Sequence, residues 1–193
     1  MSRRADPGGQ HFDRWVSSYD RSLLQPILFL PTHAAVLSAS GAAGIHPHAV
    51  LDVGCGTGAL LERAAQTWPE ARFVGIDASE QMVAEAERKH AGDSRYHFEV
   101  AEAAALPLQP NSVDIAFSTI SFHHWDDQAG GVRQVARVLR PNGLFVLADI
   151  RPPWLLRPVI QRFHSHDSRR RFLEANGFNV VEQHRFITVG RKT

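Results

Sequence analysis

Three glycines at every second position, Gly54, Gly56 and Gly58, follow the apolar run 49–53 and come just before a helical pattern. Glycine lacks a Cβ atom, so a loop of this kind can turn sharply and let a ligand approach its backbone. An acid, Asp77, ends the next apolar run, where a carboxylate can accept hydrogen bonds from ribose hydroxyls. The pattern therefore predicts a site for an adenosine-type ligand, with a glycine-rich turn that binds nothing as the alternative.

The loop by itself leaves the type of ligand open. Gly54, Gly56 and Ala59 also satisfy the dinucleotide pattern Gly-x-Gly-x-x-Gly/Ala, which makes a nicotinamide-dependent oxidoreductase one interpretation. Against it, the sequence has no Tyr-x-x-x-Lys pair after the fourth or fifth predicted strand to serve in hydride transfer. A protein that binds a cofactor without catalysis, as a regulator or scaffold, is a further interpretation, because a glycine loop indicates a ligand and not a reaction.

Adjacent histidines, His123 and His124, follow the apolar run 113–119 and precede Asp126 and Asp127, one of which caps the next helix. The ordinary pKa of histidine suits a general base near neutral pH, so both are candidate catalytic residues. The alternative is a structural role, in which their rings bind backbone groups or a neighbouring helix. We predict no metal site, because adjacent residues on one backbone run rarely point at the same ion.

The elements that must position these residues alternate along the chain. Strand-like apolar runs and helical patterns take turns, the runs lying at 49–53, 72–76, 96–100, 113–119 and 144–150. Such alternation predicts a parallel sheet with helices on both faces. The last two apolar runs, 178–181 and 186–189, are too close for a crossover helix and must be antiparallel neighbours. We therefore predict an α/β fold: a doubly wound, mainly parallel sheet of seven strands, with the last strand antiparallel.

We predict one domain over residues 1–193. Its parts are a flexible leader at 1–10, an N-terminal helical cap at 11–48, a cofactor-binding core at 49–150, and an acceptor-side segment with a closing hairpin at 151–193. The acceptor-side segment is short, which predicts an acceptor site that is open or is completed by a second copy of the chain in a homodimer. Its arginine-rich stretch, 151–171, forms either a solvated face or a contact for an anionic acceptor.

Composition limits the cellular location and the binding partners that we expect. Lysine and arginine number 21 against 20 for aspartate and glutamate, so the net charge of +1 gives no general attraction to nucleic acid. No apolar run reaches the ~18 residues of a membrane span. Cys55 is the single cysteine, so no internal disulfide can form, and the N-terminus leads into no signal peptide. We expect a cytoplasmic protein whose partner is a small-molecule acceptor.

Four segments occur in an order typical of one enzyme family: 52–58, 75–79, 102–114 and 138–144. Together they resemble motifs of the class I S-adenosylmethionine-dependent methyltransferases, closest to the small bacterial branch that includes the ubiquinone and menaquinone methyltransferases. The resemblance implies a Rossmann-like methyltransferase fold, with S-adenosylmethionine as cofactor and S-adenosylhomocysteine as product. It implies methyl transfer by in-line displacement to a small or medium-sized acceptor, through carbon, oxygen or nitrogen.

The resemblance also implies which residues hold the cofactor. Gly54, Gly56 and Gly58 would pass beneath its amino acid part and ribose. Asp52 would orient the methionine amino group, and Asp77 would bind both ribose hydroxyls. The other residues implied are Cys55 in the glycine loop, Ala78 and Met82 at the adenine, Glu102 and Ala103 at the adenine edge, Ser118 at the sulfonium, and Tyr19 at the methionine carboxylate. Glutamate at position 102 departs from the family's commoner aspartate and lengthens the reach of the carboxylate.

Overall fold

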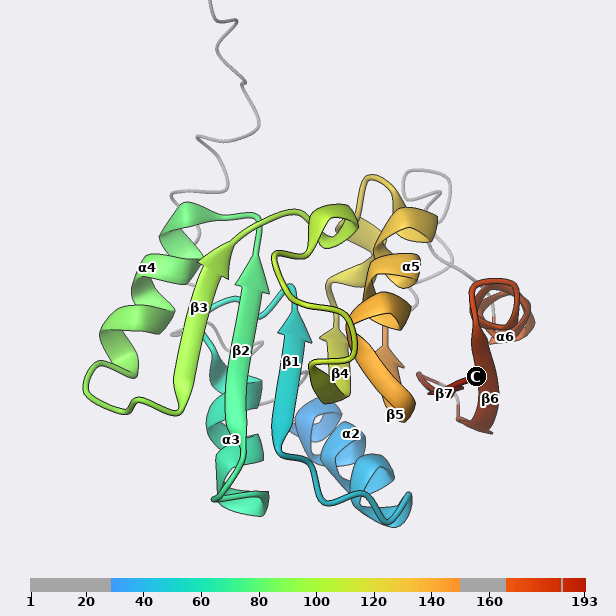
Figure 1. Ribbon diagram of the computed structural model, residues 1–193, viewed down its shortest axis with the longest axis horizontal. Helices are drawn as coiled ribbons and strands as arrows, with labels where there is room; N and C mark the ends of the chain where they lie inside the picture. Colours follow the sequence, from blue (N-terminus) through green and yellow to red (C-terminus); the bar gives the residue numbers. More distant parts are fainter. Residues whose placement is uncertain (1–28, 150–165, 185) are drawn as a thin grey trace, which may run out of the picture.

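The computed structural model describes residues 29–149, 166–184 and 186–193. Within these ranges seven strands form one sheet in the order β3-β2-β1-β4-β5-β7-β6 (Figure 1). The strands are β1 (Ala49–Val53), β2 (Arg72–Asp77), β3 (Tyr96–Val100), β4 (Val113–Thr119), β5 (Leu139–Ala148), β6 (Phe178–Gln183) and β7 (Ile187–Lys192). Strands β1 to β5 pair in parallel, and β7 runs antiparallel to both β5 and β6.

Helices cover both faces of the sheet (Figure 1). One buried apolar cluster joins the sheet to three helices, α2 (Leu30–Ala42), α3 (Ala59–Thr67) and α4 (Glu80–Lys89). A second cluster joins it to α5 (Gln128–Val138), α6 (His166–Glu174) and the short 3-10 helices η2 (Ala103–Ala105) and η3 (Phe122–His124). No helix in the described ranges is long and apolar enough to cross a membrane.

Strand β5, which is covered on both faces, explains why the sequence has unbroken apolar runs. Leu144, Val146 and Ala148 belong to the first cluster, whereas Phe145 and Leu147 belong to the second. Successive side chains of a strand point to opposite faces, so a strand covered on both sides needs an apolar residue at every position. All five are fully buried. This part of β5 therefore offers no polar side chain for chemistry, and Asp149 follows directly after the strand.

The order of the strands reverses direction between β1 and β4, near the middle of the sheet. From β1 the sheet extends through β2 and β3 on one side and through β4 and β5 on the other. In open α/β sheets, ligands bind outside the carboxyl ends of the strands at such a point of reversal. The carboxyl ends of β1 and β4 are therefore where the fold provides a site.

The predicted fold class is confirmed, with differences at the boundaries. β5 begins at Leu139 rather than at residue 144, because Leu139 already pairs with Val113 before the turn in which Asn142 is left-handed. Of the two candidate caps, Asp127 is the one that caps α5, accepting a hydrogen bond from the N–H of Gly130. The predicted leader and residues 11–28 of the predicted N-terminal cap lie outside the described residues.

Candidate functional site

The glycine loop starts where β1 ends. Gly54, Gly56 and Gly58 all have positive φ, at 80°, 53° and 82°, a conformation that other residues rarely adopt. The N–H groups of Gly54 and Cys55 both donate to the carbonyl of Ile76 in β2, at 2.7 and 3.1 Å. These bonds fold the loop over the end of the sheet, and Gly58 then caps α3.

Two of these glycines have different surroundings. A Cβ atom added to Gly54 would lie 2.4 Å from both Cβ and Oγ of Ser121, so the missing side chain lets a second loop pack against the backbone. A Cβ atom added to Gly56 would have Met82 Sδ as its nearest neighbour, 4.0 Å away. Gly54 is therefore closed by protein, whereas the backbone of Gly56 is open to a ligand.

Asp77 ends β2, and its carboxylate reaches the glycine loop. Oδ2 accepts a hydrogen bond from Gly56 N–H at 2.8 Å, and Oδ1 accepts one from Ser79 N–H at 2.9 Å. Burial raises the pKa of the Asp77 carboxyl, and the backbone N–H donors oppose that rise. Each oxygen has a second lone pair, so the half-buried carboxylate can still accept hydrogen bonds from two ligand hydroxyls.

Asp52, in β1, is buried, and its Oδ1 has no hydrogen-bond partner among the described residues. Burial, and then the nearby charge of Asp77, raises the pKa of Asp52 from 3.8 to about 8. A buried acceptor without a donor is costly, and a positively charged donor would remove that cost. The residues present therefore fit S-adenosylmethionine, which carries two ribose hydroxyls and a cationic amino acid part.

Four predicted adenine contacts lie near the ends of β2 and β3. Ala78 and Glu102 are exposed, and Met82 is buried with its sulfur beside the glycine loop. Ala103 is buried and packs toward Gly131 of α5. The structure thus brings Met82 to the loop, and it gives Ala103 a packing contact in addition to any contact with a ligand.

The other predicted cofactor contacts are turned into the protein or lie outside the described residues. The Cys55 thiol is buried, and burial is the main cause of its raised pKa, so the thiol stays protonated and unreactive. Ser118 is fully buried, with its Oγ 2.9 Å from Ser121 Oγ. Tyr19 is outside the described residues.

The two candidate catalytic histidines differ in their surroundings. His123 is largely buried, and its Nδ1 lies 2.9 Å from Oδ1 of Asp149. The main-chain N–H of His123 also donates to Oδ2 of Asp149, at 3.1 Å. His124 is exposed, and its ring centre lies 4.0 Å from that of His123. A carboxylate at Nδ1 favours the tautomer with its proton there, so Nε2 is the ring nitrogen that can act as a base.

Asp149 is held from three directions. It follows β5 directly, and its own N–H donates to the carbonyl of Phe186, just before β7, at 3.0 Å. The buried guanidinium of Arg169, from α6, donates to the main-chain carbonyls of Asp149 and Phe186 at 3.3 and 3.1 Å. The main chain of the residue that orients His123 is therefore anchored by β5, by α6 and by the residue before β7.

Asp149 is the candidate site residue that the sequence analysis missed. It lies 26 positions after His123, too far for any local motif to connect the two. The available signal was an acid at the end of the apolar run 144–150, on a strand that neighbours the one preceding the histidines. The carboxyl ends of parallel neighbours meet at one edge of a sheet, which would have placed Asp149 near His123.

The turn between β4 and η3 is strained. Ile120 has a φ of 53°, and a non-glycine residue in such a region costs about 1–3 kcal/mol. Its N–H donates to the carbonyl of Ala148 at 2.8 Å, which fixes the turn against the end of β5. The strain persists only because the surroundings hold it. The turn is thereby fixed to β5, and the hydrogen bond from Ser121 Oγ to the carbonyl of Val53 fixes it to β1 as well.

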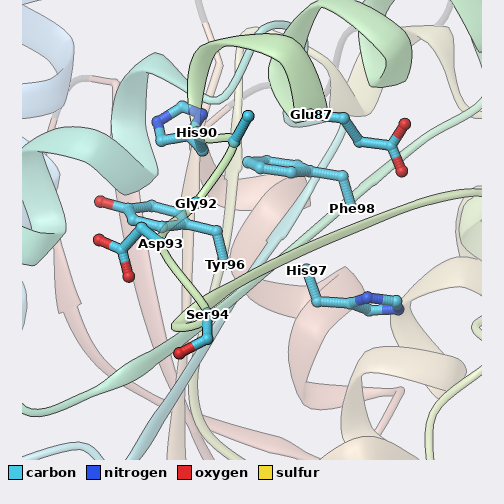
Figure 2. Close-up of a pocket in the computed structure, with 9 residues that line it drawn as sticks. Glu87, His90, Gly92, Asp93, Ser94, Tyr96, His97 and Phe98 are labelled. Carbon is cyan, nitrogen blue, oxygen red and sulfur yellow. The ribbon is translucent and has the colours of Figure 1, made fainter.

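A separate hollow of about 370 Å³ lies between the end of α4 and the edge strand β3 (Figure 2). The rings of His90, Tyr96 and Phe98 gather there, with the His90 and Tyr96 ring centres 4.3 Å apart. An added Cβ at Gly58 would lie 3.0 Å from both His90 and Phe98. These rings support the glycine loop from beneath, and none of the predicted cofactor residues lines the hollow.

Comparison with known proteins agrees with this geometry. Residues 50–143 match a family model described as a methyltransferase domain. The malonyl-[acyl-carrier protein] O-methyltransferase of Hahella chejuensis (strain KCTC 2396) is 33% identical over 132 residues, which are 67% of this chain and 47% of the relative. The chain thus spans about half the length of this curated relative.

Two solved structures show the same fold. YcgJ of Bacillus subtilis is 27% identical, with a TM-score of 0.65 over 77% of this chain and 71% of the other. A chain from the complex between the Haloferax volcanii Trm112 methyltransferase activator and a methyltransferase gives a TM-score of 0.75 over 99% of both chains, at 21% identity. None of these three names mentions a quinone, so the narrower quinone branch stays an expectation from the motifs. The chain belongs to the class I S-adenosylmethionine-dependent methyltransferases.

Proposed function

We propose that this chain transfers the methyl group of S-adenosylmethionine to an oxygen atom of a small or medium-sized acceptor, leaving S-adenosylhomocysteine. The observation that carries the proposal is the hydrogen bond between His123 and Asp149 at the same edge of the sheet as the glycine loop. A hydroxyl must lose its proton to accept a methyl group, whereas an amine needs only to be neutral. A histidine oriented by a carboxylate supplies the base that oxygen transfer requires.

The cofactor half of the site binds S-adenosylmethionine and aligns its methyl group for transfer. When bound, S-adenosylmethionine supplies a methyl group activated by its positively charged sulfur. Asp77 accepts hydrogen bonds from the ribose hydroxyls, the backbone at Gly56 lies beneath the ligand, and Asp52 meets its positive end. Alignment of this kind is worth as much as about 7–11 kcal/mol of the barrier in well-oriented systems. Met82, Ala78, Glu102 and Ala103 complete the proposed cofactor set, together with Tyr19, which lies outside the described residues.

The acceptor half handles the proton. Asp149 accepts the Nδ1 proton of His123 and holds the ring so that Nε2 takes the proton of the acceptor hydroxyl as the oxygen forms its bond to the methyl group. The imidazolium that results is stabilised by the same carboxylate. A positioned base of this type contributes about 10²–10⁴-fold to a rate. The malonyl-[acyl-carrier protein] relative is named as an O-methyltransferase, which favours oxygen as the methylated atom.

Titration calorimetry tests the cofactor part of the proposal. We expect S-adenosylmethionine and S-adenosylhomocysteine to bind with micromolar affinity and NADH not to bind. Asp77→Ala should weaken binding about 100-fold, because two hydrogen bonds to a charged group are lost. The control is Asp93→Ala, which removes an acid that is paired with Arg95 at the other end of β3.

The outcomes separate the rival functions. Binding of NADH instead of the sulfur compounds would indicate a nicotinamide-dependent oxidoreductase. Binding of neither would contradict the proposal and leave a scaffold or regulator without this cofactor. A small-molecule acceptor in the cytoplasm, met by one chain or by a homodimer, is the setting we propose. An activator subunit, as in the Haloferax volcanii complex, is a second arrangement to test by adding such a subunit to the assay.

A further inference from the structure

Ser121 connects the cofactor half and the acceptor half of the site. It lies between β4 and η3, two positions before His123. Its Cβ and Oγ occupy the space that a side chain on Gly54 would need. Ser121 can pack against the glycine loop because Gly54 has no Cβ atom. The two loops therefore cannot move independently without losing this contact.

A chain of hydrogen bonds strengthens the contact. Ser121 Oγ donates to the carbonyl of Val53, the residue directly before the glycine loop, at 2.9 Å. A hydroxyl has one proton, so the proton between Ser121 and Ser118, whose Oγ atoms are 2.9 Å apart, must come from Ser118. The backbone at Val53 and Gly54 is thus held by two partners. Ser121 binds the carbonyl of Val53, and Ile76 of β2 accepts the N–H of Gly54.

The other side of Ser121 leads to the base. Its carbonyl accepts the N–H of His124, which closes the turn of η3. His123, in the middle of η3, is bound through its ring and its main chain to Asp149 after β5. The short helix that carries the candidate base is therefore held at one end by the cofactor loop and in its middle by the acceptor side.

We propose that Ser121 is a positioning residue that transmits cofactor binding from the glycine loop to His123. The inference rests on the proposed function, since it takes the glycine loop as the cofactor site. A ligand that settles on the backbone at Gly56 shifts Val53 and Gly54, and Ser121 passes the shift to η3. The hydrogen bond of His123 to Asp149 is already in place without a ligand, so what the cofactor changes is the position of the bonded ring relative to the acceptor side.

The test follows the His123 ring directly and needs no known acceptor. Protein with ¹³C at histidine Cε1 is titrated with S-adenosylhomocysteine, and the His123 signal is assigned by its absence in His123→Gln. We expect the signal to move on saturation in the native protein. In Ser121→Ala the movement should fall to less than about half, while calorimetry shows S-adenosylhomocysteine still bound with affinity lowered about two- to tenfold, the worth of a hydrogen bond. Ser121→Thr, which keeps the hydroxyl, should restore the movement.

The matched control is Ser112→Ala, which also removes a hydroxyl donor to a backbone carbonyl, that of Gln109, at the opposite end of β4. In Ser112→Ala the His123 signal should move on titration as far as it does in the native protein. Thermal unfolding of all variants checks that each is folded. A full movement in Ser121→Ala, or no movement in the native protein with ligand bound, would overturn the inference alone. Failure of the native protein to bind S-adenosylhomocysteine would overturn the proposed function and the inference with it.

Discussion

On the cofactor side of the site two acidic side chains raise each other's cost of ionisation, whereas on the acceptor side the carboxylate is hydrogen-bonded to a histidine. Asp52 is buried beside Asp77, and each has a raised pKa. Asp149, also buried, accepts hydrogen bonds from the ring and the main chain of His123. The acidic side chains of the cofactor half therefore have no positively charged partner in the part of the chain that the structure describes. The carboxylate of the acceptor half has hydrogen-bond donors.

This difference separates the tasks of the two halves. The cofactor half is completed by its ligand, whose cationic part and hydroxyls satisfy acids that the protein leaves underpaired. The acceptor half has its hydrogen bonds in place before any ligand arrives. Changes in the cofactor half should therefore act on affinity and on the pH dependence of stability, and changes in the acceptor half should act on turnover.

The largest effect is expected from the acceptor half. His123→Gln should lower turnover about 10²–10⁴-fold, the contribution of a positioned base, with the affinity for S-adenosylhomocysteine unchanged. Asp149→Asn should lower turnover in the same direction, because an amide does not stabilise the imidazolium. Steady-state kinetics with an acceptor found by screening, together with calorimetry, checks both.

The exposed neighbour provides the control for these variants. His124→Gln should leave turnover within about twofold of the native value, since His124 lies on the same turn and its ring is exposed. If His124→Gln lost as much turnover as His123→Gln, the pairing with Asp149 would not identify the base. A large loss of cofactor affinity in His123→Gln would break the division between the halves.

The next effect concerns the backbone of the cofactor half. Gly54→Ala places a Cβ at a φ of 80° and 2.4 Å from Ser121, so strain and overlap together should lower the free energy of unfolding by about 3 kcal/mol. Urea unfolding measures this. Gly92→Ala is the matched control, because Gly92 has a φ of 92° and no atom within 4 Å of an added Cβ. Equal losses in both variants would mean that the contact with Ser121 contributes nothing.

The cofactor half could be predicted from the sequence because its parts are local. Gly54, Gly56 and Gly58 are consecutive positions of one loop, and the loop works through its backbone. Asp77 is placed at it by a single parallel pairing, that of β1 with β2. The periodicity of the apolar runs was enough to infer that pairing, and with it the fold class. As a set, the residues assigned to the cofactor stay predictions until a ligand is bound.

The acceptor half could not be predicted in the same way, because it depends on which face of each strand a side chain occupies. His123 meets Asp149 only once β4 and β5 are aligned with Thr119 opposite Ala148. A shift of one residue would turn Asp149 to the other face of the sheet. The role of Ser121 depends in addition on the left-handed turn at Ile120, for which a β-branched residue gives no sequence signal.

A smaller effect should appear in the pH dependence of stability. The pKa of Asp52 is about 8 in the folded protein and 3.8 in the unfolded chain, so the folded state holds a proton that the unfolded state has lost. The stability this provides is complete below pH 3.8 and is lost as the pH rises through 8. Between pH 6.5 and 8 the free energy of unfolding should fall by up to about 2 kcal/mol. Urea unfolding of the ligand-free protein measures the slope.

Asp52→Asn is the control for this slope, because the amide does not titrate and should flatten it. The window starts at pH 6.5 to avoid His33, whose pKa is lowered from 6.5 to about 4 by burial and then by Arg63. A histidine held neutral gives stability that rises with pH between these two values, opposite in sign to the contribution of Asp52. A slope that is equal in native protein and Asp52→Asn would mean that Asp52 is ionised in the fold.

The smallest effect is expected at Cys55, and it tests whether the cofactor half works through its backbone. The thiol belongs to the apolar cluster with Phe73 and Phe98 and donates to the carbonyl of Gly56 at 3.5 Å, so Cys55→Ala removes a buried group and keeps the backbone of the loop. We expect stability to change by about 1 kcal/mol or less and S-adenosylhomocysteine affinity to stay within about twofold. In the native protein the thiol should react with iodoacetamide only as fast as the chain unfolds, because burial keeps its pKa raised. Rapid alkylation of the folded protein, or a tenfold loss of affinity in Cys55→Ala, would show that a side chain of the loop takes part in binding and that the two halves differ less than their carboxylates suggest.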